Sequence, residues 1–298
     1  MMDAPRDGAC WAFIRGSLEL FLYGWYPEPE RWRVNITFFL FGAAVFGALR
    51  ENIPGKKYWL MFAAVFPFLA AWLLFGGFGL EPVATSKLGG ILLTLVVAVT
   101  GISFSLPLGI ALALGRRSRL PVLRAICVIF IGFIRGVPLI TLLFVASTML
   151  TYFLPPGSSF DLLIRVLIMV TLFAAAYIAE VVRGGLQGLA SGQYEAADAL
   201  GLTYWQSHRL IILPQALKIS IPGIVNTFIG SYKDSVLVLI IGMMDILGLG
   251  RARLNDPDWL GLAPELYIFI SLFFFVSCFA MSRYSLSLEK KLETGHQS

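Results

Sequence analysis

The sequence predicts an all-α integral membrane protein. Of its 298 residues, 58% are hydrophobic and only 14% are charged, whereas soluble domains carry roughly 25% charged residues. The mean hydropathy is +0.80, and the apolar residues form long runs that short polar segments separate. Because a bilayer offers no water to backbone polar groups, runs of this length are expected to be helices.

The apolar runs predict about seven membrane spans, each near the length that a helix needs to cross hydrocarbon. Two spans, at 34–49 and 58–79, come first, and five follow at 88–114, 125–153, 161–182, 219–242 and 265–282. The predicted organisation is therefore a tail at 1–33, added N-terminal spans at 34–87, a transmembrane domain at 88–284 and a second tail at 285–298.

The first tail is predicted to carry an amphipathic helix that lies in the membrane interface. Apolar side chains recur there at helical spacing within residues 11–26: Trp11, Ile14, Leu18, Phe21 and Trp25. A stretch of about fifteen residues is too short to span hydrocarbon, and an amphipathic helix of this kind binds at the surface of the bilayer.

Lys and Arg beside the spans predict the orientation, because cytoplasmic loops carry an excess of both. Grouping segments 50–57, 115–124, 183–218 and 283–298 on one side collects Arg50, Lys56, Lys57, Arg116, Arg117, Arg119, Arg124, Arg183, Arg209, Lys218, Arg283, Lys290 and Lys291. The opposite loops hold Lys87, Arg251 and Arg253. The first group is predicted to be cytoplasmic, together with the C-terminus, and seven spans then place the N-terminal tail outside.

Several function classes are excluded by what the sequence lacks. Lys and Arg flank apolar spans and form no continuous basic face, so no nucleic-acid partner is expected. Cys10, Cys127 and Cys278 have no disulfide or metal-site spacing, and the two histidines, His208 and His296, lie outside the spans. No phosphate-binding loop is present. We therefore expect no cofactor and no catalytic residue in this chain, and a membrane enzyme would need a reactive cluster that is absent.

A polar island at 190–216 interrupts the apolar sequence and predicts a docking loop. A helix is expected from Glu195 to Leu200, a break at Gly201, a second helix from Thr203 to Leu213, and a return to the membrane at Pro214. The small side chains of the two alanines would let a partner approach closely. The residues expected to contact that partner are Tyr194, Glu195, Ala196, Ala197, Asp198, Leu200, Gly201, Ile211, Leu213 and Pro214.

Polar residues inside the fourth and sixth apolar runs predict a path for a solute, because ionisable groups are costly at bilayer depth and usually face a cavity or a partner. The candidates are Arg135, Pro138, Asn226, Ser231, Lys233 and Asp234. Pro138 is expected to break its helix and to free backbone groups that can bind a carboxylate or an ammonium group. The alternative is that these residues fix helix packing, with Arg135 bound to backbone carbonyls.

Two further expectations concern local geometry within the spans. Glu180 and Arg183 stand three residues apart near a helix end, which favours a local ion pair. Pro222, Gly223 and Gly230 predict a kink in the middle of the sixth run.

The loop pattern, Glu-Ala-Ala, three residues, Gly, nine residues, Ile, one residue, Leu-Pro, resembles the signature loop of ATP-binding-cassette importer permeases. Phe133–Leu139, Ala176–Gly185 and Asn226–Asp234 resemble the polar-amino-acid uptake branch, and nearly the whole chain is similar to the M-type permease subunit of general L-amino-acid importers. The resemblance implies a type I importer core of five spans at 88–284, with the loop at 190–216 as the contact with an ATPase.

The same resemblance implies the partners and the location. They are a sister permease, two copies of an ATPase subunit that bind ATP and Mg, and a periplasmic amino-acid-binding protein, assembled in a bacterial inner membrane. The implied function is uptake of L-amino acids with broad specificity. The alternative is a secondary transporter driven by an ion gradient, which would be expected to show internal repeats with paired broken helices. No second copy of the stretches around Arg135 or Lys233 is seen.

Overall fold

The computed structural model describes residues 10–50, 53–153 and 160–293, and this part of the chain is helical with no β-strand. The long helices are α2 (Arg31–Leu49), α3 (Lys56–Phe75), α4 (Gly90–Arg116), α8 (Leu162–Gln187), α11 (Leu213–Asp234) and α13 (Ala263–Glu293). Six helical segments in the described residues are long and apolar enough to cross a membrane, or seven with one bent pair included. The all-α membrane fold is confirmed.

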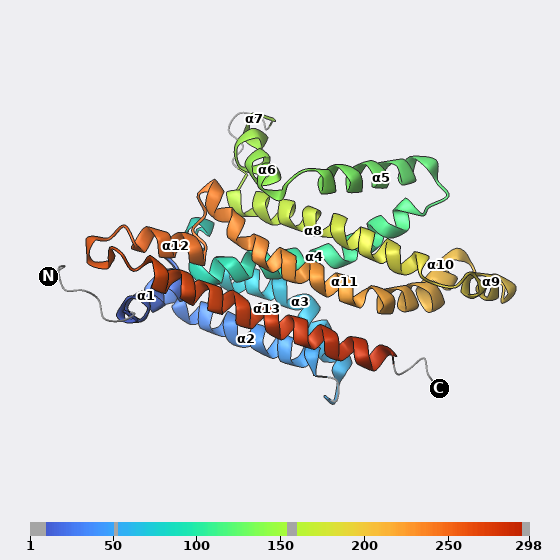
Figure 1. The fold of residues 1–298 in the computed structure, drawn as a ribbon, viewed down its shortest axis with the longest axis horizontal. Helices are drawn as coiled ribbons and strands as arrows, with labels where there is room; N and C mark the ends of the chain where they lie inside the picture. The colour runs from blue at the N-terminus through green and yellow to red at the C-terminus, as the bar shows by residue number, and fades with distance from the viewer. Residues whose placement is uncertain (1–9, 51–52, 154–159, 294–298) are drawn as a thin grey trace.

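The shorter helices cap the bundle and connect its members. They are α1 (Ala12–Tyr23), α5 (Pro121–Gly136), α6 (Leu139–Phe144), α7 (Leu150–Phe153), α9 (Ser191–Ala199), α10 (Tyr204–Ser207) and α12 (Ile246–Arg253). Figure 1 places α1 and α12 at one end of the bundle, and α9 and α10 at the other end, where α13 also finishes. The predicted docking loop and the C-terminal helix end therefore point the same way.

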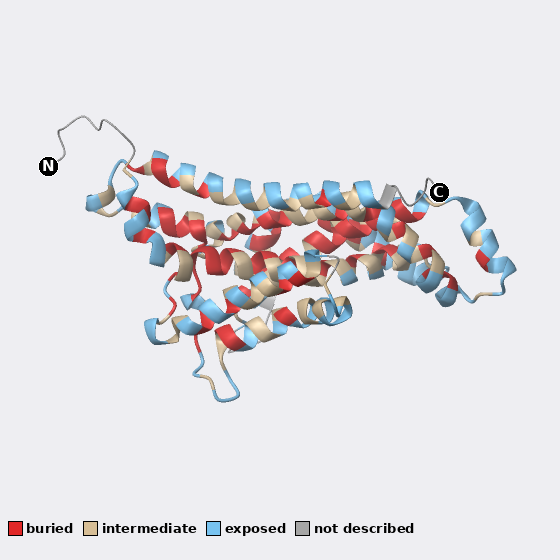
Figure 2. Cartoon of the chain, turned by 90° about the horizontal axis from the view of Figure 1, so that it is seen from below, coloured by how far each residue is buried: buried red, intermediate tan, exposed pale blue. Residues whose placement is uncertain are grey.

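The centre of the bundle is a tightly packed set formed by α4, α8 and α11 (Figure 2). Glycines make the close approach possible, as small residues do between membrane helices. A Cβ atom on Gly109 of α4 would lie 2.6 Å from the Ile178 side chain, and one on Gly185 of α8 would lie 2.1 Å from Ser220 Oγ. The three central helices are thus fixed relative to one another.

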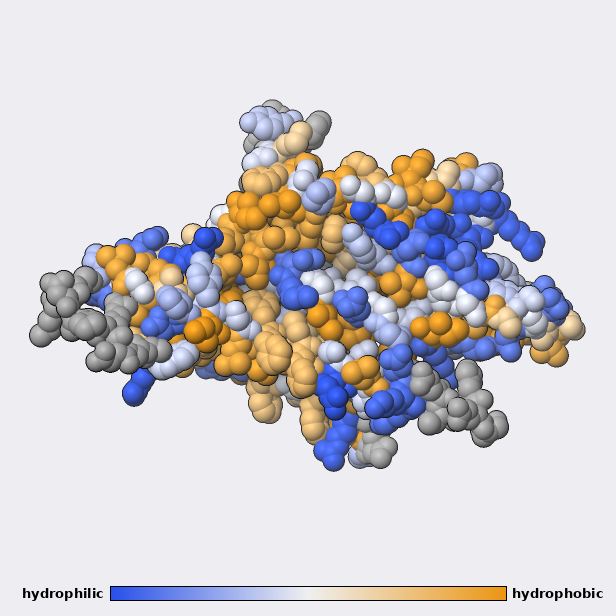
Figure 3. Space-filling model, in the orientation of Figure 1, coloured by the Kyte–Doolittle hydropathy of each residue, from blue (hydrophilic) through white to orange (hydrophobic). Residues whose placement is uncertain are grey.

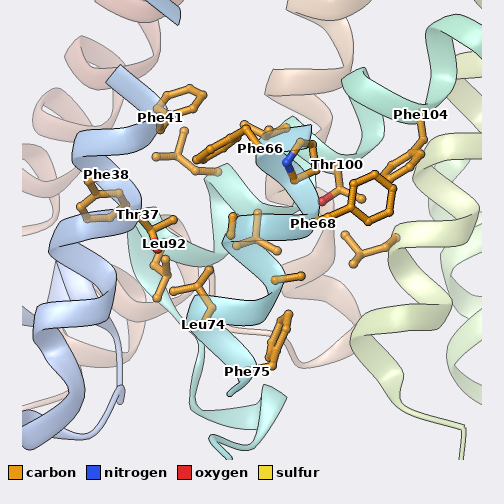
Figure 4. A pocket seen from close by; sticks show the side chains of 17 residues that line it. Thr37, Phe38, Phe41, Phe66, Phe68, Leu74, Phe75, Leu92, Thr100 and Phe104 are labelled. Carbon is orange, nitrogen blue, oxygen red and sulfur yellow. The ribbon is translucent and has the colours of Figure 1, made fainter. Parts of the chain in front are cut away.

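The added helices α2 and α3 form a pair that joins the core at one end. Arg33 is 2% exposed and links three segments: its Nε lies 2.6 Å from Glu30, and its Nη1 donates to the Glu81 carbonyl at 2.7 Å. Tyr26 donates its hydroxyl to the Leu74 carbonyl at 2.8 Å, and burial raises its pKa. Nearer mid-span, aromatic side chains of α2 and α3 line an apolar cavity of about 170 Å³ against α4 (Figure 4).

Helix α1, which was predicted to lie in the membrane interface, packs one of its faces against protein. Its buried face contains Phe13, Ile14 and Phe21, and it packs on α4, α12 and α13. Ring contacts hold it there: Phe13 lies 5.5 Å from Trp259, and Phe21 stacks on Phe269 at 5.5 Å. The other members of the predicted apolar stripe, Trp11, Leu18 and Trp25, are exposed, and the interfacial position of the helix stays a prediction. Helix α12, which the sequence did not indicate, supplies the missing apolar partner.

The fourth apolar run is not one straight helix. Helices α5 and α6 meet at an angle of 102°, with Val137 and Pro138 in extended conformation between them. Figure 1 shows α5 alongside the bundle and α6 turned away from it. The break predicted at Pro138 is confirmed, and the run predicted as one span over 125–153 is a bent pair of helices.

The sixth run is one continuous α-helix across the position of the predicted kink. Helix α11 continues through Pro222, Gly223 and Gly230, and the helical geometry changes only at Ser235, where a 3₁₀ helix, η5 (Ser235–Ile241), begins. Gly223 serves packing, because a Cβ atom there would lie 2.6 Å from the Val181 side chain. The sequence signal for a kink was therefore partly a signal for close helix contact.

Candidate functional site

The loop at 190–216 is a helical hairpin with well-defined ends. Helix α9 stops in a Schellman motif: Gly201 has a φ of 70°, its N–H donates to the Asp198 carbonyl at 2.9 Å, and the Leu202 N–H donates to the Ala197 carbonyl at 3.2 Å. Glycine adopts this left-handed conformation without the penalty that a Cβ atom imposes. The break predicted at Gly201 is confirmed.

The second arm of the hairpin leads into the membrane without interruption. Thr203 and Gln206 form a capping box at the start of α10. A π-helical turn, η4 (His208–Ile212), then joins α10 to α11. Pro214 lies in the first turn of α11, and its missing N–H explains why the preceding turn departs from the α-helical hydrogen-bond pattern.

Tyr194 fastens α9 to the core. Its hydroxyl donates to the Leu186 carbonyl at 3.0 Å and accepts a hydrogen bond from Arg117 Nη1 at 3.0 Å. The Arg117 guanidinium also lies 5.4 Å from the centre of the tyrosine ring. Since Leu186 is near the end of α8 and Arg117 follows α4, movement of α9 would be passed to two core helices.

The free side of the hairpin presents large apolar side chains among polar ones. Leu200 and Trp205 are each 72% exposed, and Leu210 is 65% exposed. A hairpin that presents such side chains outside the apolar spans has the character of a protein contact surface. Trp205 and Leu210 were missed by the sequence reasoning, although large apolar residues in a polar segment were a usable signal.

Two of the residues predicted to contact a partner, Ala197 and Glu195, differ in exposure. Ala197 is wholly buried, where α9 packs on α10 and η4, so of the alanine pair only Ala196 is exposed to a partner. Helix α9 begins before Glu195, at Ser191. Among the described residues Glu195 has no bonding partner, and it is exposed.

The other predicted loop residues divide between surface and core. Asp198 and Pro214 are exposed, whereas Ile211 and Leu213 are half-buried. Ile211 packs against the apolar cluster beneath the loop. The spaced pattern therefore combines residues that hold the hairpin with residues that a partner can reach.

A second polar site lies inside the bundle around Glu180 of α8. The predicted pair with Arg183 is present. Glu180 also lies 2.6 Å from Arg116 Nη1 of α4 and 3.5 Å from Arg135 Nη1 of α5. One carboxylate is thus shared by three guanidinium groups from three helices, which leaves the cluster with an excess of positive charge.

Arg135 is held by side chains and not by the backbone carbonyls proposed as its alternative. Besides Glu180, it lies 5.4 Å from the centre of the Tyr177 ring. Its side chain is 39% exposed, so part of the guanidinium remains open to a partner or solute. Pro138, three residues on, begins α6 at the 102° bend.

The predicted path residues on α11 do not converge on this cluster. Gly223 of α11 faces Val181 of α8, so Lys233 lies ten residues beyond the level of Glu180, roughly 15 Å along the helix. Asn226 and Lys233 are exposed at helical spacing, Asp234 is half-buried, and Ser231 is buried on another side. Hydrophilic side chains interrupt the apolar surface over α11 in Figure 3. The structure forms two separate polar sites.

An unpredicted acid, Asp245, lies beyond η5 at the opposite end from the hairpin. It is wholly buried, and its Oδ1 accepts a hydrogen bond from the Gly248 N–H at 2.8 Å, which caps α12. Its other carboxyl oxygen has no hydrogen-bond partner among the described residues. Burial raises the pKa of Asp245 to about 6. In the same described part, no cluster of His, Cys, Asp and Glu could hold a metal ion.

A helical bundle with a hairpin of this kind is the architecture of an importer's membrane subunit. The chain belongs to the family of binding-protein-dependent transport system inner membrane components, whose model matches residues 105–294. The matched segment includes α5, the Glu180 cluster, the hairpin and α11.

Similar proteins support the same assignment. The chain is 49% identical, over 98% of its length and 80% of the relative's, to the inner membrane amino-acid ABC transporter permease protein YhdY of Escherichia coli strain K12. It is 45% identical, over 97% of its length and 80% of the relative's, to the glutamate/glutamine/aspartate/asparagine transport system permease protein BztC of Rhodobacter capsulatus.

A solved structure gives the same fold. The chain superposes with a TM-score of 0.60 and 28% identity on a structure described as an amino acid ABC transporter with histidines, over 68% of this chain and 92% of that one.

Proposed function

We propose that this chain is the permease subunit of an ATP-driven, binding-protein-dependent importer of L-amino acids of broad specificity. The relatives named for amino-acid transport match almost the whole chain, which supports the solute class. The observation that carries the coupling role is the hairpin, with its exposed apolar surface and its anchor on two core helices.

The proposed assembly contains a sister permease, two copies of an ATPase subunit and a periplasmic amino-acid-binding protein in a bacterial inner membrane. The hairpin and the C-terminus lie on the cytoplasmic side, where ATP is found. ATP and Mg bind to the ATPase, and hydrolysis belongs to that partner. This chain acts by receiving the motion of the ATPase through the hairpin and by passing it to α8, α4 and α11.

The proposed solute path uses the exposed polar groups of the two intramembrane sites. Arg135 can attract a carboxylate, because three guanidinium groups share one acid there. Asn226, Lys233 and Asp234 form a polar face on α11 that must meet a partner or water in the membrane. Ser231 is buried in this chain and is left out of the path.

The test is co-purification of the tagged chain from its own bacterium in mild detergent. An ATPase and a second permease are expected to be retained, and the chain separated from them should not turn over ATP. A chain that transports amino acids alone, driven by an ion gradient, would contradict the proposal and favour a secondary transporter.

A further inference from the structure

A cleft of about 890 Å³ separates the hairpin from the ends of α4 and α5, and the transport proposal gives it no role. Its walls come from α4, the α4–α5 turn, the first half of α5, α9 and α10. The lining residues used below are Pro107, Ile110, Leu114, Leu123, Arg117 and Arg119.

The cleft changes character along its length. The deeper wall is apolar, with Pro107, Ile110 and Leu114 on one face of α4 and Leu123 on α5. Pro107 lies nine residues before the end of α4 at Arg116, roughly 13 Å along the helix. Because α4 is a membrane span, this wall extends from the end of the span into the hydrocarbon layer.

The mouth of the cleft is basic. Arg117, Arg119 and Arg124 surround the α4–α5 turn, and none of them forms an ion pair with a carboxylate in the part of the chain that the structure describes. Arg117 bonds to the Leu186 carbonyl and the Tyr194 hydroxyl, and Arg124 bonds to the Ser118 carbonyl. Asp198 is the acid in the described lining, and the guanidinium groups of Arg117 and Arg119, which also line the cleft, outweigh it. Arg116, by contrast, forms an ion pair with Glu180.

We propose that this cleft binds an anionic phospholipid, with its phosphate at Arg117 and Arg119 and an acyl chain along the apolar wall of α4. Basic pockets between membrane helices on the cytoplasmic side bind such headgroups. A free phosphate or nucleotide would leave the apolar wall uncovered, and a zwitterionic amino acid would leave the arginines without a matching excess of negative charge. The placement of the cleft in the cytoplasmic leaflet rests on the proposed function.

The bound lipid would contact the transport machinery directly. Tyr194 and Asp198 of α9, and Tyr204, Trp205 and His208 of the second arm, all line the cleft. A lipid there would fill the space between the hairpin and α4. The lipid composition of the inner leaflet would therefore affect the mobility of the hairpin.

The experiment measures phosphatidylglycerol retained by the purified complex after reconstitution in phosphatidylcholine nanodiscs that contain phosphatidylglycerol, with native mass spectrometry as the readout. Arg119→Gln should reduce retention about fivefold, the scale expected for one basic residue at an anionic surface. Arg119 is the cleanest position, because it is exposed and holds no other part of the described chain. Leu123→Trp, which fills the apolar wall and keeps every charge, should reduce retention as well.

The matched control is Arg283→Gln on α13, an exposed basic residue at the same end of the bundle, which should leave retention unchanged. Added inorganic phosphate should not displace the lipid. Equal loss in Arg119→Gln and Arg283→Gln, displacement by phosphate, or retention that disappears when the ATPase is bound would each overturn the proposal. A chain that retains lipid but purifies without an ATPase would contradict only the proposed transport function. A complex that contains the ATPase but retains no lipid would contradict only the lipid proposal.

Discussion

The hairpin and the Glu180 cluster are both built from charged and aromatic residues, yet the hairpin is exposed at the end of the molecule and the cluster lies inside the bundle. Glu195 on the hairpin is exposed and has no bonding partner among the described residues, whereas Glu180 is shared by three arginines inside the bundle. The free carboxylate is available to another protein, and the shared one holds this chain together. The comparison shows how to tell the two kinds of contact apart. A charged residue with no bonding partner in the described chain is a candidate for contact with another protein, and one with several partners stabilises the fold.

The largest expected effect is the loss of the shared carboxylate. Glu180→Gln leaves three guanidinium groups without their counter-charge in a half-buried site and should cost roughly 1–2 kcal/mol of stability, between the values for exposed and buried ion pairs. The thermal unfolding midpoint of the detergent-solubilised chain measures it. Glu195→Gln is the matched control and should unfold at the wild-type temperature. Equal midpoints for the two variants would remove the distinction between the two sites.

The next effect is functional and comes from the hairpin turn. A Cβ atom on Gly201 would meet nothing within 4 Å in this chain, so Gly201→Asp should cost only about 1 kcal/mol, for its left-handed backbone. Its charge should nevertheless disrupt ATPase binding or uncouple hydrolysis from uptake. Gly201→Asn is the control, because asparagine tolerates the same backbone without charge. Normal uptake and ATPase binding by Gly201→Asp, combined with normal function of Glu195→Lys, would show that the hairpin is not the coupling element.

A smaller effect is expected far from both sites, at Asp245. An acid whose pKa is higher in the folded chain binds its proton more tightly there, so its stabilising contribution is present at low pH and is lost as the pH rises through about 6. Asp245→Asn keeps the cap on α12 and removes the charge. The variant should unfold at a higher temperature than wild type at pH 8, and the two should converge near pH 4. A midpoint difference that does not change with pH would contradict the assignment.

The smallest effect on stability is expected at Arg135. Its side chain is 39% exposed and 3.5 Å from Glu180, so Arg135→Gln should cost less than about 1 kcal/mol. If Arg135 lies on the solute path, uptake should fall severalfold while the complex still assembles. Loss of the assembled complex with unchanged uptake per remaining complex would assign Arg135 to packing.

The sequence predicted the hairpin well because its determinants are local. The backbone conformation of the hairpin is determined within a few residues of Gly201, Thr203 and Pro214. The spacing of these residues therefore predicted the turn and the starts of the helices. The Glu180 cluster depends on Arg116, 64 positions earlier in the chain, and no periodicity in one sequence reveals such a contact. Only the pair with Arg183, within a single helix turn, could be predicted.

What the sequence did not show has the same physical origin. Helix α1 was predicted to be interfacial from its short length and apolar spacing, and its contact with α12, far along the chain, was not visible in the sequence. Gly223 was taken as part of a kink, although it provides space for Val181 on another helix. Ala197 was assigned to a partner and is buried in this chain. In each case a residue's neighbour across the fold decided its role.

The most direct test of the central claim is site-specific photocrosslinking from the hairpin. A photoreactive phenylalanine analogue at Leu200, which is 72% exposed, is compared with one at Phe39 of α2, which is 76% exposed. In membranes of the native bacterium, the Leu200 position should crosslink to the ATPase subunit, and the Phe39 position should not. No ATPase adduct from Leu200, or equal adducts from both positions, would contradict the account of the hairpin as the coupling element.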